Sequence, residues 1–377
     1  MLYEPREDSY FLQDFVNKYS RGVVLDMGTG SGIQAITAAK KGCRVVASDI
    51  QASAIKAATE NAAAEGVDIE FVKGDLFSRV PRMKFETVIF NPPYLPQDKN
   101  IRDPSLYGGK RGYETIERFF SELGYYLAED GIVLFVFSSI TGRYNVDGIL
   151  KKYLFESEIL GVKTIFFEDI YVYLARKSAV LQTLEYRGIT RPENFARGKR
   201  GIILVGEYMG NKVAIKIRNP ESRALLRMEN EARWLKMLNE YGIGPLYVFS
   251  GEDFLVYRFA EGMLVEEFLA RGSRRQRLSV ITDLLEQLFT MDSIRVNKEE
   301  MHHPVKHIII GKRPIMIDFE RCHYTQRPKN VSQFCQYIMK IAGKQDPGFM
   351  EVVRAYKAGL GKADFSRIIK YLKSNLL

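Results

Sequence analysis

Apolar and polar residues alternate in blocks along the first half of the chain, and the blocks predict strands and helices in turn. Short runs rich in apolar and β-branched residues predict strands at residues 23–28, 43–50, 69–76, 86–93 and 131–139. Alanine-rich or amphipathic stretches predict helices at 33–42, 52–66 and 113–128. Two last strands, 158–168 and 169–177, meet at two charged residues and predict a hairpin. This order predicts a doubly wound α/β sheet, parallel except at one hairpin edge.

The pattern changes near Ser178. A short helix is predicted first, then close strands at 201–209 and 212–219, a helix at 221–242, strands at 247–251 and 254–259, and mostly helix afterwards. This order is typical of a small α+β domain. We therefore expect two domains, residues 1–180 and 181–377, joined by a linker at about 178–192.

Composition and charge narrow the class of protein. The 377 residues are 46% hydrophobic, and no apolar run is long enough to cross a bilayer, so we expect a cytoplasmic protein with no membrane partner. The three cysteines form no disulfide pattern. Residues 1–180 hold 22 basic and 24 acidic residues, whereas the remainder holds 33 and 22, a net charge of +11. Such an excess serves solubility or attracts a polyanion such as RNA; we expect no DNA partner.

The first strand ends in a glycine-rich turn that predicts a nucleotide-type ligand. It contains Asp26, Gly28, Gly30 and Gly32, and glycines let the backbone approach a ligand closely. The next strands end at Asp49, which can bind both ribose hydroxyls, and at Asp75-Leu76, which can receive an adenine amino group. A glycine turn alone would also suit a nicotinamide enzyme, but this set predicts S-adenosylmethionine.

The fourth predicted strand ends in Asn91-Pro92-Pro93-Tyr94, which indicates methylation of a planar nitrogen. The Asn91 side-chain oxygen and a backbone carbonyl of the turn can accept hydrogen bonds from an NH₂ group, which orients the nitrogen for attack on the methyl group. Pro92 and Pro93 stiffen the turn, and Tyr94 can stack on the planar group. Asn91, Pro92 and Tyr94 are thus the predicted catalytic residues.

Through these residues, the first half resembles the HemK-type glutamine methyltransferases, which modify translation release factors. The resemblance covers residues 1–180, including the segments Tyr3 to Tyr10 and Tyr107 to Gly112. It looks most like the archaeal and eukaryotic branch, and so implies a release factor as substrate, a small zinc-ribbon activator protein as partner, and Glu7 and Asp8 in the pocket. The same motif occurs in enzymes that methylate adenine N6 or guanine N2, so tRNA is an alternative acceptor.

The second half carries a set of residues in the order expected of a kinase. Lys216 ends the run Val-Ala-Ile-Lys and can bind nucleotide phosphates, Glu231 in the next helix can pair with it, and Asp318 can hold Mg²⁺. Gly198 and Gly201 are candidates for a reduced phosphate loop. These residues predict a domain that binds ATP and Mg²⁺.

The catalytic loop departs from the usual kinase pattern. His302 and His307 lie five apart, at the spacing of the usual base and second metal ligand, and Glu300 competes with His302 as the base. A pseudokinase stays open as an alternative. The histidines and Cys322 show no zinc-site spacing.

The second half resembles a compact archaeal kinase family related to the RIO kinases, and looks like the archaeal RNA kinases, over roughly residues 190–345. That resemblance implies phosphorylation of a ribose 2′-hydroxyl in tRNA. We therefore expect a methyltransferase fused to a kinase, both serving translation. The alternatives are tRNA methylation, a protein Ser/Thr kinase, or a non-catalytic RNA-binding module in the second half.

Overall fold

A computed structural model describes residues 5–97, 107–165, 167–197, 201–218, 227–252, 254–343 and 346–376. The chain divides into two compact units. The first holds Met1–Asn194 and Gly206–Gly210, and the second holds Phe195–Val205 and Asn211–Leu377. No helix among the described residues is both long and apolar enough to cross a membrane.

The first unit alternates strands with helices, as the sequence predicts. Its elements are α1 (Glu7–Tyr19), β1 (Val23–Met27), α2 (Ile33–Lys40), β2 (Arg44–Asp49), α3 (Ala52–Ala64), β3 (Glu70–Lys73), the 3₁₀ turn η1 (Leu76–Arg79), β4 (Phe85–Phe90), α4 (Glu114–Leu123), β5 (Leu127–Ser138), α5 (Arg143–Lys152), β6 (Phe155–Ile165), β7 (Glu168–Lys177) and α6 (Ala179–Tyr186).

These strands form one seven-stranded sheet of order β3-β2-β1-β4-β5-β7-β6. The pairs β1–β2, β1–β4, β2–β3 and β4–β5 are parallel, whereas β7 runs antiparallel to both β5 and β6. The doubly wound sheet and its hairpin edge are therefore confirmed. Because β1 to β4 are parallel, their carboxyl ends share one edge, and the loops of the predicted site meet there.

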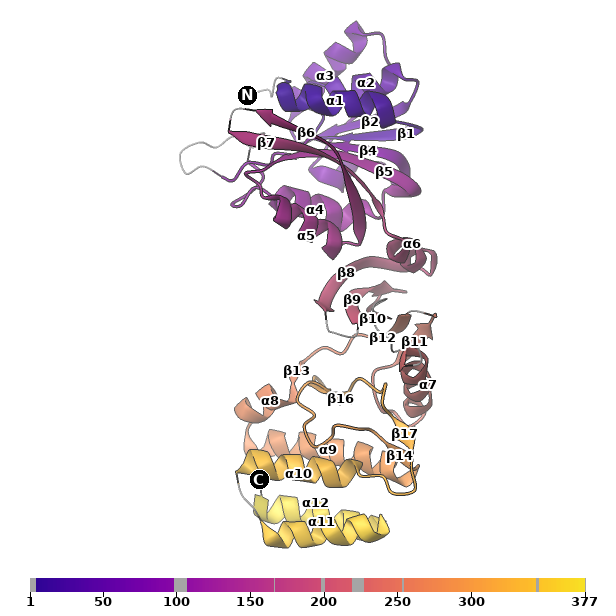
Figure 1. The fold of residues 1–377 in the computed structure, drawn as a ribbon, viewed down its shortest axis with the longest axis vertical. Helices are drawn as coiled ribbons and strands as arrows, with labels where there is room; N and C mark the ends of the chain where they lie inside the picture. The colour runs from indigo at the N-terminus through magenta and orange to yellow at the C-terminus, as the bar shows by residue number, and fades with distance from the viewer. Residues whose placement is uncertain are drawn as a thin grey trace. The chain divides into compact units, whose positions relative to one another are not determined.

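Helices cover both faces of this sheet (Figure 1), with α1, α2 and α3 on one face and α4 and α5 on the other. Neighbouring strand residues point to opposite faces. Val24 and Leu134 join Leu12 of α1 in one buried cluster, whereas Leu25 and Phe135 belong to the cluster that packs on α4 and α5. Burial on both faces explains why the central strands read as continuous apolar runs.

The structure corrects one helix and fills the segment expected to be a linker. The helix predicted at 113–128 ends at Leu123, because β5 already begins at Leu127, which pairs with Phe85 of β4. The short helix predicted after Ser178 is confirmed as α6 at residues 179–186, and its Leu181 is buried in the first unit.

The boundary between the units falls within β8 (Ile189–Arg197) and β9 (Gly201–Tyr208), so each of these strands has residues in both units. The other elements of the second unit are β10 (Asn211–Arg218), α7 (Arg227–Asn239), β11 (Tyr247–Ser250), β12 (Phe254–Arg258), β13 (Met263–Leu264), α8 (Val265–Arg271), α9 (Arg274–Ser293), β14 (Val296–Asn297), β15 (Ile308–Ile310), β16 (Pro314–Met316), β17 (His323–Tyr324), α10 (Asn330–Ala342), α11 (Pro347–Gly359), α12 (Lys362–Tyr371) and the π turn η2 (Leu372–Leu376).

Strands lead and helices follow in this second half, as expected for an α+β domain. The strands form a sheet of order β11-β12-β10-β9-β8, a three-stranded sheet β13-β15-β16 and the pair β14–β17. One buried cluster runs from the strands through α7 into α9, α10, α11 and α12. The strands predicted at 201–209, 212–219, 247–251 and 254–259 are confirmed, and β8 was not predicted.

Candidate functional site

A tight turn joins β1 to α2, and three of its glycines have left-handed backbone conformations. Gly28, Gly30 and Gly32 have φ angles of 67°, 56° and 87°, which residues with a Cβ rarely adopt. A Cβ on Gly32 would lie 3.1 Å from that of Ala58, so glycine lets α2 begin close to α3. Gly28 and Gly30 line the pocket at the carboxyl edge of the sheet, where a ligand can approach their backbone.

Asp26 fixes this turn from inside the protein. Its Oδ2 accepts hydrogen bonds from the hydroxyl of Thr29 at 2.6 Å and from the backbone N–H of Ala35 at 3.1 Å. Burial raises the pKa of Asp26 to about 7, although the Thr29 and Ala35 hydrogen bonds act to lower it. The carboxyl group is thus a positioned polar group at the floor of the pocket.

Two more carboxylates line the same pocket. Asp49 accepts hydrogen bonds from the backbone N–H of Gly30 at 3.0 Å and of Gln51 at 2.8 Å, which fix its orientation toward the glycine turn. Asp75 forms an ion pair of 2.7 Å with Arg118 of α4. The structure therefore brings both predicted acidic residues to the pocket, and it adds Arg118, which no motif had indicated.

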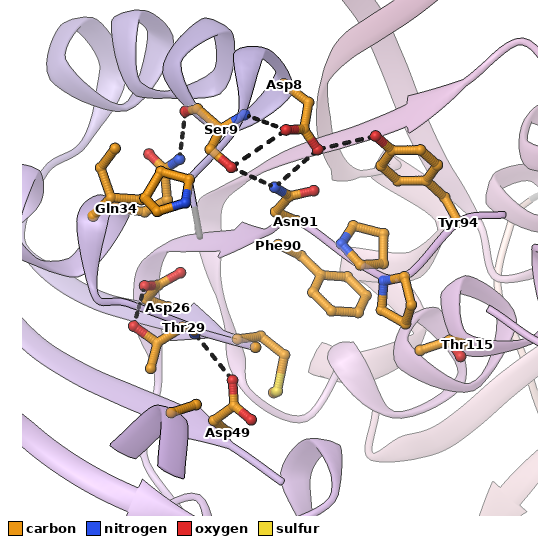
Figure 2. Close-up of a pocket in the computed structure, with 18 of the residues that line it drawn as sticks. Asp8, Ser9, Asp26, Thr29, Gln34, Asp49, Phe90, Asn91, Tyr94 and Thr115 are labelled. Atoms are coloured by element: carbon orange, nitrogen blue, oxygen red, sulfur yellow. Dashed lines mark hydrogen bonds between the residues drawn. The ribbon is translucent and has the colours of Figure 1, made fainter. Parts of the chain in front are cut away.

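The Asn91 side chain lies beside the first turn of α1 (Figure 2). Its Nδ2 donates to Asp8 Oδ2 at 3.4 Å and to Ser9 Oγ at 3.3 Å. The Tyr94 hydroxyl donates to the same Asp8 oxygen at 2.9 Å. Because Asn91 presents its nitrogen to α1, its carbonyl oxygen is the end left to accept hydrogen bonds from a substrate NH₂ group.

Thr141 and two glycines that follow Tyr107 contact the turn from Asn91 to Tyr94. Thr141 donates from its hydroxyl to the backbone oxygen of Tyr94 at 2.6 Å. A Cβ on Gly108 would lie 2.3 Å from the Pro93 oxygen, and one on Gly112 would lie 2.5 Å from the Tyr94 oxygen. Glycine at these two positions allows two backbone segments to pack in direct contact, which fixes the shape of the turn.

One cavity of about 780 Å³ joins these groups. Its lining includes the glycine turn, the three aspartates, Leu76 and the whole Asn91 to Tyr94 turn. The size and the polar groups fit S-adenosylmethionine with room for an acceptor. Asp49 could bind the ribose hydroxyls of that cofactor, and the glycine turn could lie against it. When bound, the cofactor would supply an electrophilic methyl group.

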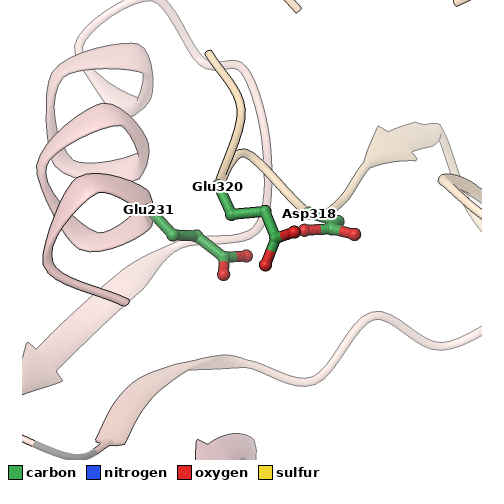
Figure 3. Close-up of side chains that lie close together, drawn as sticks. All are labelled: Glu231, Asp318 and Glu320. Atoms are coloured by element: carbon green, nitrogen blue, oxygen red, sulfur yellow. The ribbon is translucent and has the colours of Figure 1, made fainter. Parts of the chain in front are cut away.

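A second cluster lies in the other unit, where three carboxylates, those of Glu231, Asp318 and Glu320 (Figure 3), lie near Lys216. The ammonium group of Lys216 is 2.6 Å from Glu231, 3.4 Å from Asp318 and 3.8 Å from Glu320. Ligand oxygens of these three carboxylates lie within 4.8 Å of one another. Burial lowers the pKa of Lys216, but the attraction of Glu231 and Asp318 outweighs it and keeps the lysine charged.

The predicted pairing of Lys216 with Glu231 is therefore present, and Asp318 is beside it. Asp318 has a left-handed φ of 63°. Burial acts to raise its pKa, but Lys216 and Lys298 outweigh burial and lower it, so the carboxylate is ionised. Three clustered carboxylates suit Mg²⁺, which prefers oxygen ligands. Glu320 and Lys298 join the predicted set, and no motif had indicated either.

The predicted catalytic loop divides between two surfaces. Glu300 contacts His307 at 3.5 Å and Arg321 at 2.5 Å, and it lines the pocket of Asp318. His302 is exposed and lines a neighbouring hollow instead. Of the predicted phosphate-loop glycines, Gly201 begins β9, and Gly198 lies outside the described residues, as do Tyr3 and Glu4.

The sheet order, the glycine turn and the Asn-Pro-Pro-Tyr turn define a class I S-adenosylmethionine-dependent methyltransferase in the first half. The family described as "Methyltransferase small domain" matches residues 7–166. A protein of Methanocaldococcus jannaschii that bears the name "Putative protein N5-glutamine methyltransferase" is 38% identical over 177 residues, which are 45% of this chain and 89% of that protein. Through its first half, the chain belongs to the same methyltransferase family as that protein.

Other similar proteins match at lower sequence identity. The release factor glutamine methyltransferase of Bacillus cereus is 36% identical over 126 residues, and this chain spans 44% of its length. The Mtq2-Trm112 complex of E. cuniculi, which methylates the termination factor eRF1, is 28% identical, with 47% of this chain and 98% of that chain covered, at a TM-score of 0.40. The bifunctional kinase-methyltransferase WbdD is 14% identical over 97% of this chain and 89% of that chain, at a TM-score of 0.42.

Proposed function

We propose that the first half methylates the side-chain amide nitrogen of a glutamine in a peptide release factor. The observation that carries this proposal is the Asn91 amide, which Asp8 and Ser9 hold at the edge of the cofactor pocket. The acceptor is a primary amide, and the Asn91 oxygen can accept a hydrogen bond from it. The 38% identity to a protein N5-glutamine methyltransferase supports a glutamine over a nucleobase.

The transfer needs positioning more than base catalysis. The amide nitrogen attacks the methyl carbon, the carbon–sulfur bond breaks, and S-adenosylhomocysteine leaves. A proton then leaves the methylated nitrogen for solvent. Asn91 and the backbone of the proline-stiffened turn hold the NH₂ group in line with the sulfur, and Tyr94 offers its ring to the planar amide.

A direct test uses the full chain, S-adenosylmethionine and a release factor with its Gly-Gly-Gln motif. Mass spectrometry should find one added methyl group on that glutamine and none when it is replaced by glutamate. Asn91→Ala should lower the rate by about 100-fold or more while the cofactor still binds. Methylation of tRNA instead of the release factor would overturn the proposal. Repeating the assay with a small zinc-ribbon activator protein tests the partner that the resemblance implies.

We further propose that the second half transfers the γ-phosphate of ATP. The supporting observation is that Lys216, Glu231 and Asp318, distant in sequence, meet in one cluster. Lys216 would bind the phosphates and Asp318 with Glu320 would hold Mg²⁺. We expect the acceptor to be a tRNA ribose hydroxyl, whose oxygen attacks the γ-phosphorus as the bond to ADP breaks and whose proton passes to the base.

The pocket geometry favours Glu300 as that base, since it shares a pocket with Asp318, whereas His302 does not. γ-Labelled ATP, offered with bulk tRNA and with total protein, tests the activity. Label in a nuclease-sensitive band supports the proposal, and label only in protein points to a protein kinase. Bound ATP without any transfer would establish a pseudokinase. Comparing Glu300→Ala with His302→Ala then assigns the base.

A further inference from the structure

Next to the Lys216 cluster lies a separate hollow of about 540 Å³. It is lined by Asn297, Glu299, Glu300, His302, Arg321, His323, Thr325, Arg327, Lys329 and Gln333. The strand pair β14–β17 forms part of it, with Asn297 opposite His323, and Lys329 immediately precedes α10. Glu300 borders both this hollow and the pocket of Asp318.

The cationic side chains of the hollow differ in whether a carboxylate forms an ion pair with them. Arg321 is paired with Glu300 at 2.5 Å. Arg327 and Lys329, in contrast, form no ion pair with any carboxylate in the described part of the chain. Their backbone is nevertheless fixed, since the Lys329 N–H donates to Asn297 at 2.9 Å and the Arg327 N–H donates to Thr325 at 3.3 Å. Three cations, Arg321, Arg327 and Lys329, line the hollow against two carboxylates, Glu299 and Glu300, so its lining carries a net positive charge that favours an anion.

The other lining residues indicate which kind of anion would fit. All ten carry a charged, amide, hydroxyl or imidazole group, and none is aliphatic or a phenyl ring. A ribose–phosphate backbone is polar along its length and is bound mostly by such groups. Imidazoles such as those of His302 and His323 can also stack on bases. The lining therefore fits RNA better than a protein segment.

We propose that this hollow binds the RNA acceptor, with Arg327 and Lys329 on a phosphodiester group and the acceptor hydroxyl next to Glu300. The inference rests on the proposed phosphotransfer activity, because it places the acceptor on one side of Glu300 and the Lys216 cluster on the other. Arg327 and Lys329 are positioning residues for the acceptor and take no part in binding ATP.

The test compares two charge reversals in the full chain. The double variant Arg327→Glu/Lys329→Glu changes the hollow, and Arg354→Glu/Lys357→Glu makes the same charge change on the exposed face of α11. The hollow variant should raise the KM for tRNA about tenfold or more, leave the KM for ATP within about twofold, and reduce the slope of log affinity against log salt by about 0.7 to 0.9, as expected for the loss of one phosphate contact. The α11 variant should change each value much less, and Arg327→Lys should retain most of the tRNA affinity.

The outcomes separate this inference from the proposed activity. If Lys216→Met abolishes transfer to tRNA but the hollow variant has an unchanged KM for tRNA, the hollow is not the acceptor site and the kinase stands. An equal loss in the α11 variant also overturns the inference, because binding then follows total charge. If the wild type transfers no phosphate while the hollow variant still loses tRNA binding, the kinase proposal fails and the hollow remains an RNA-binding surface. Label found only in protein overturns the inference.

Discussion

Asp8 links the two residues that would hold the methyl acceptor, because it accepts hydrogen bonds from both Asn91 and Tyr94. In Asp8→Asn, the new side chain can place an amide nitrogen, which is a hydrogen-bond donor, against Asn91. Asn91 would then no longer be held with its own nitrogen toward α1. We expect kcat for methylation to fall by about tenfold or more, with the affinity for S-adenosylmethionine nearly unchanged. Asp14→Asn makes the same change on the exposed side of α1 and should have no effect. Equal rates in the two variants would contradict this role.

Asp26 makes stability depend on pH in a stated direction. Its pKa is about 7 in the folded protein against 3.8 for the ordinary group, because of burial. Below about pH 4 the side chain is protonated in both states, and between about 4 and 7 only the unfolded chain loses the proton. The folded protein should therefore lose stability as pH rises from 4 to 7, by as much as about 4 kcal/mol, and change little above 7.

Asp26→Asn removes this titration while it keeps an oxygen for Thr29 and Ala35. Thermal unfolding of the cofactor-free protein from pH 5 to pH 8 should therefore show a smaller decline in Tm for the variant than for the wild type. Parallel declines in the two proteins would show that Asp26 is ionised in the folded state at low pH.

Residues at strand ends could be predicted from the sequence, whereas their distant partners could not. Asn91, Asp49 and Asp75 each follow a recognisable apolar run, and parallel strands bring such ends to one edge. Arg118 and Lys298 carry no such signal. Each reaches its site because elements far apart in the chain pack together. In the sequence alone, a polar residue in a helix or loop cannot be distinguished from an ordinary surface residue.

At the scale of elements, the turn from Asn91 to Tyr94 depends on the glycines packed against it. A Cβ on Gly112 would lie 2.5 Å from the Tyr94 oxygen, at a φ of 89°. Gly112→Ala should destabilise the first unit by about 1–3 kcal/mol and lower the methylation rate. Gly148→Ala is the control, because Gly148 lies inside α5 with open space around it, and should stabilise by about 0.5–1 kcal/mol. A Gly112→Ala protein with wild-type stability and rate would contradict the packing account.

The sequence predicted strands better than boundaries. The central strands are buried on both faces, so each forms a continuous apolar run that is easily recognised in the sequence. The helix predicted at 113–128, in contrast, included residues that begin β5. β8 was missed because Pro192, Glu193 and Asn194 interrupt any apolar alternation, and its pairing with β9 depends on the rest of that sheet. The short helix predicted after Ser178 is confirmed as α6, within the segment that was also expected to be a linker.

At the scale of the whole chain, the methyltransferase site and the proposed kinase site use different residues in different units. The methyl site draws on α1 and the ends of β1 to β4, and the Lys216 cluster draws on β10, α7 and the loop after β16. Among the described residues, none that forms the hydrogen bonds around Asn91 also takes part in the ion pairs of Lys216. The two activities should therefore be separable by mutation.

The most direct measurement follows both transfers in one reaction, with methyl-labelled S-adenosylmethionine, γ-labelled ATP, a release factor and tRNA. Wild type, Asn91→Ala and Lys216→Met are compared. We expect Asn91→Ala to lose methyl transfer alone and Lys216→Met to lose phosphate transfer alone, each by about 100-fold or more. Loss of both labels in either variant, or phosphate transfer that survives in Lys216→Met, would contradict the account of two independent centres in one chain.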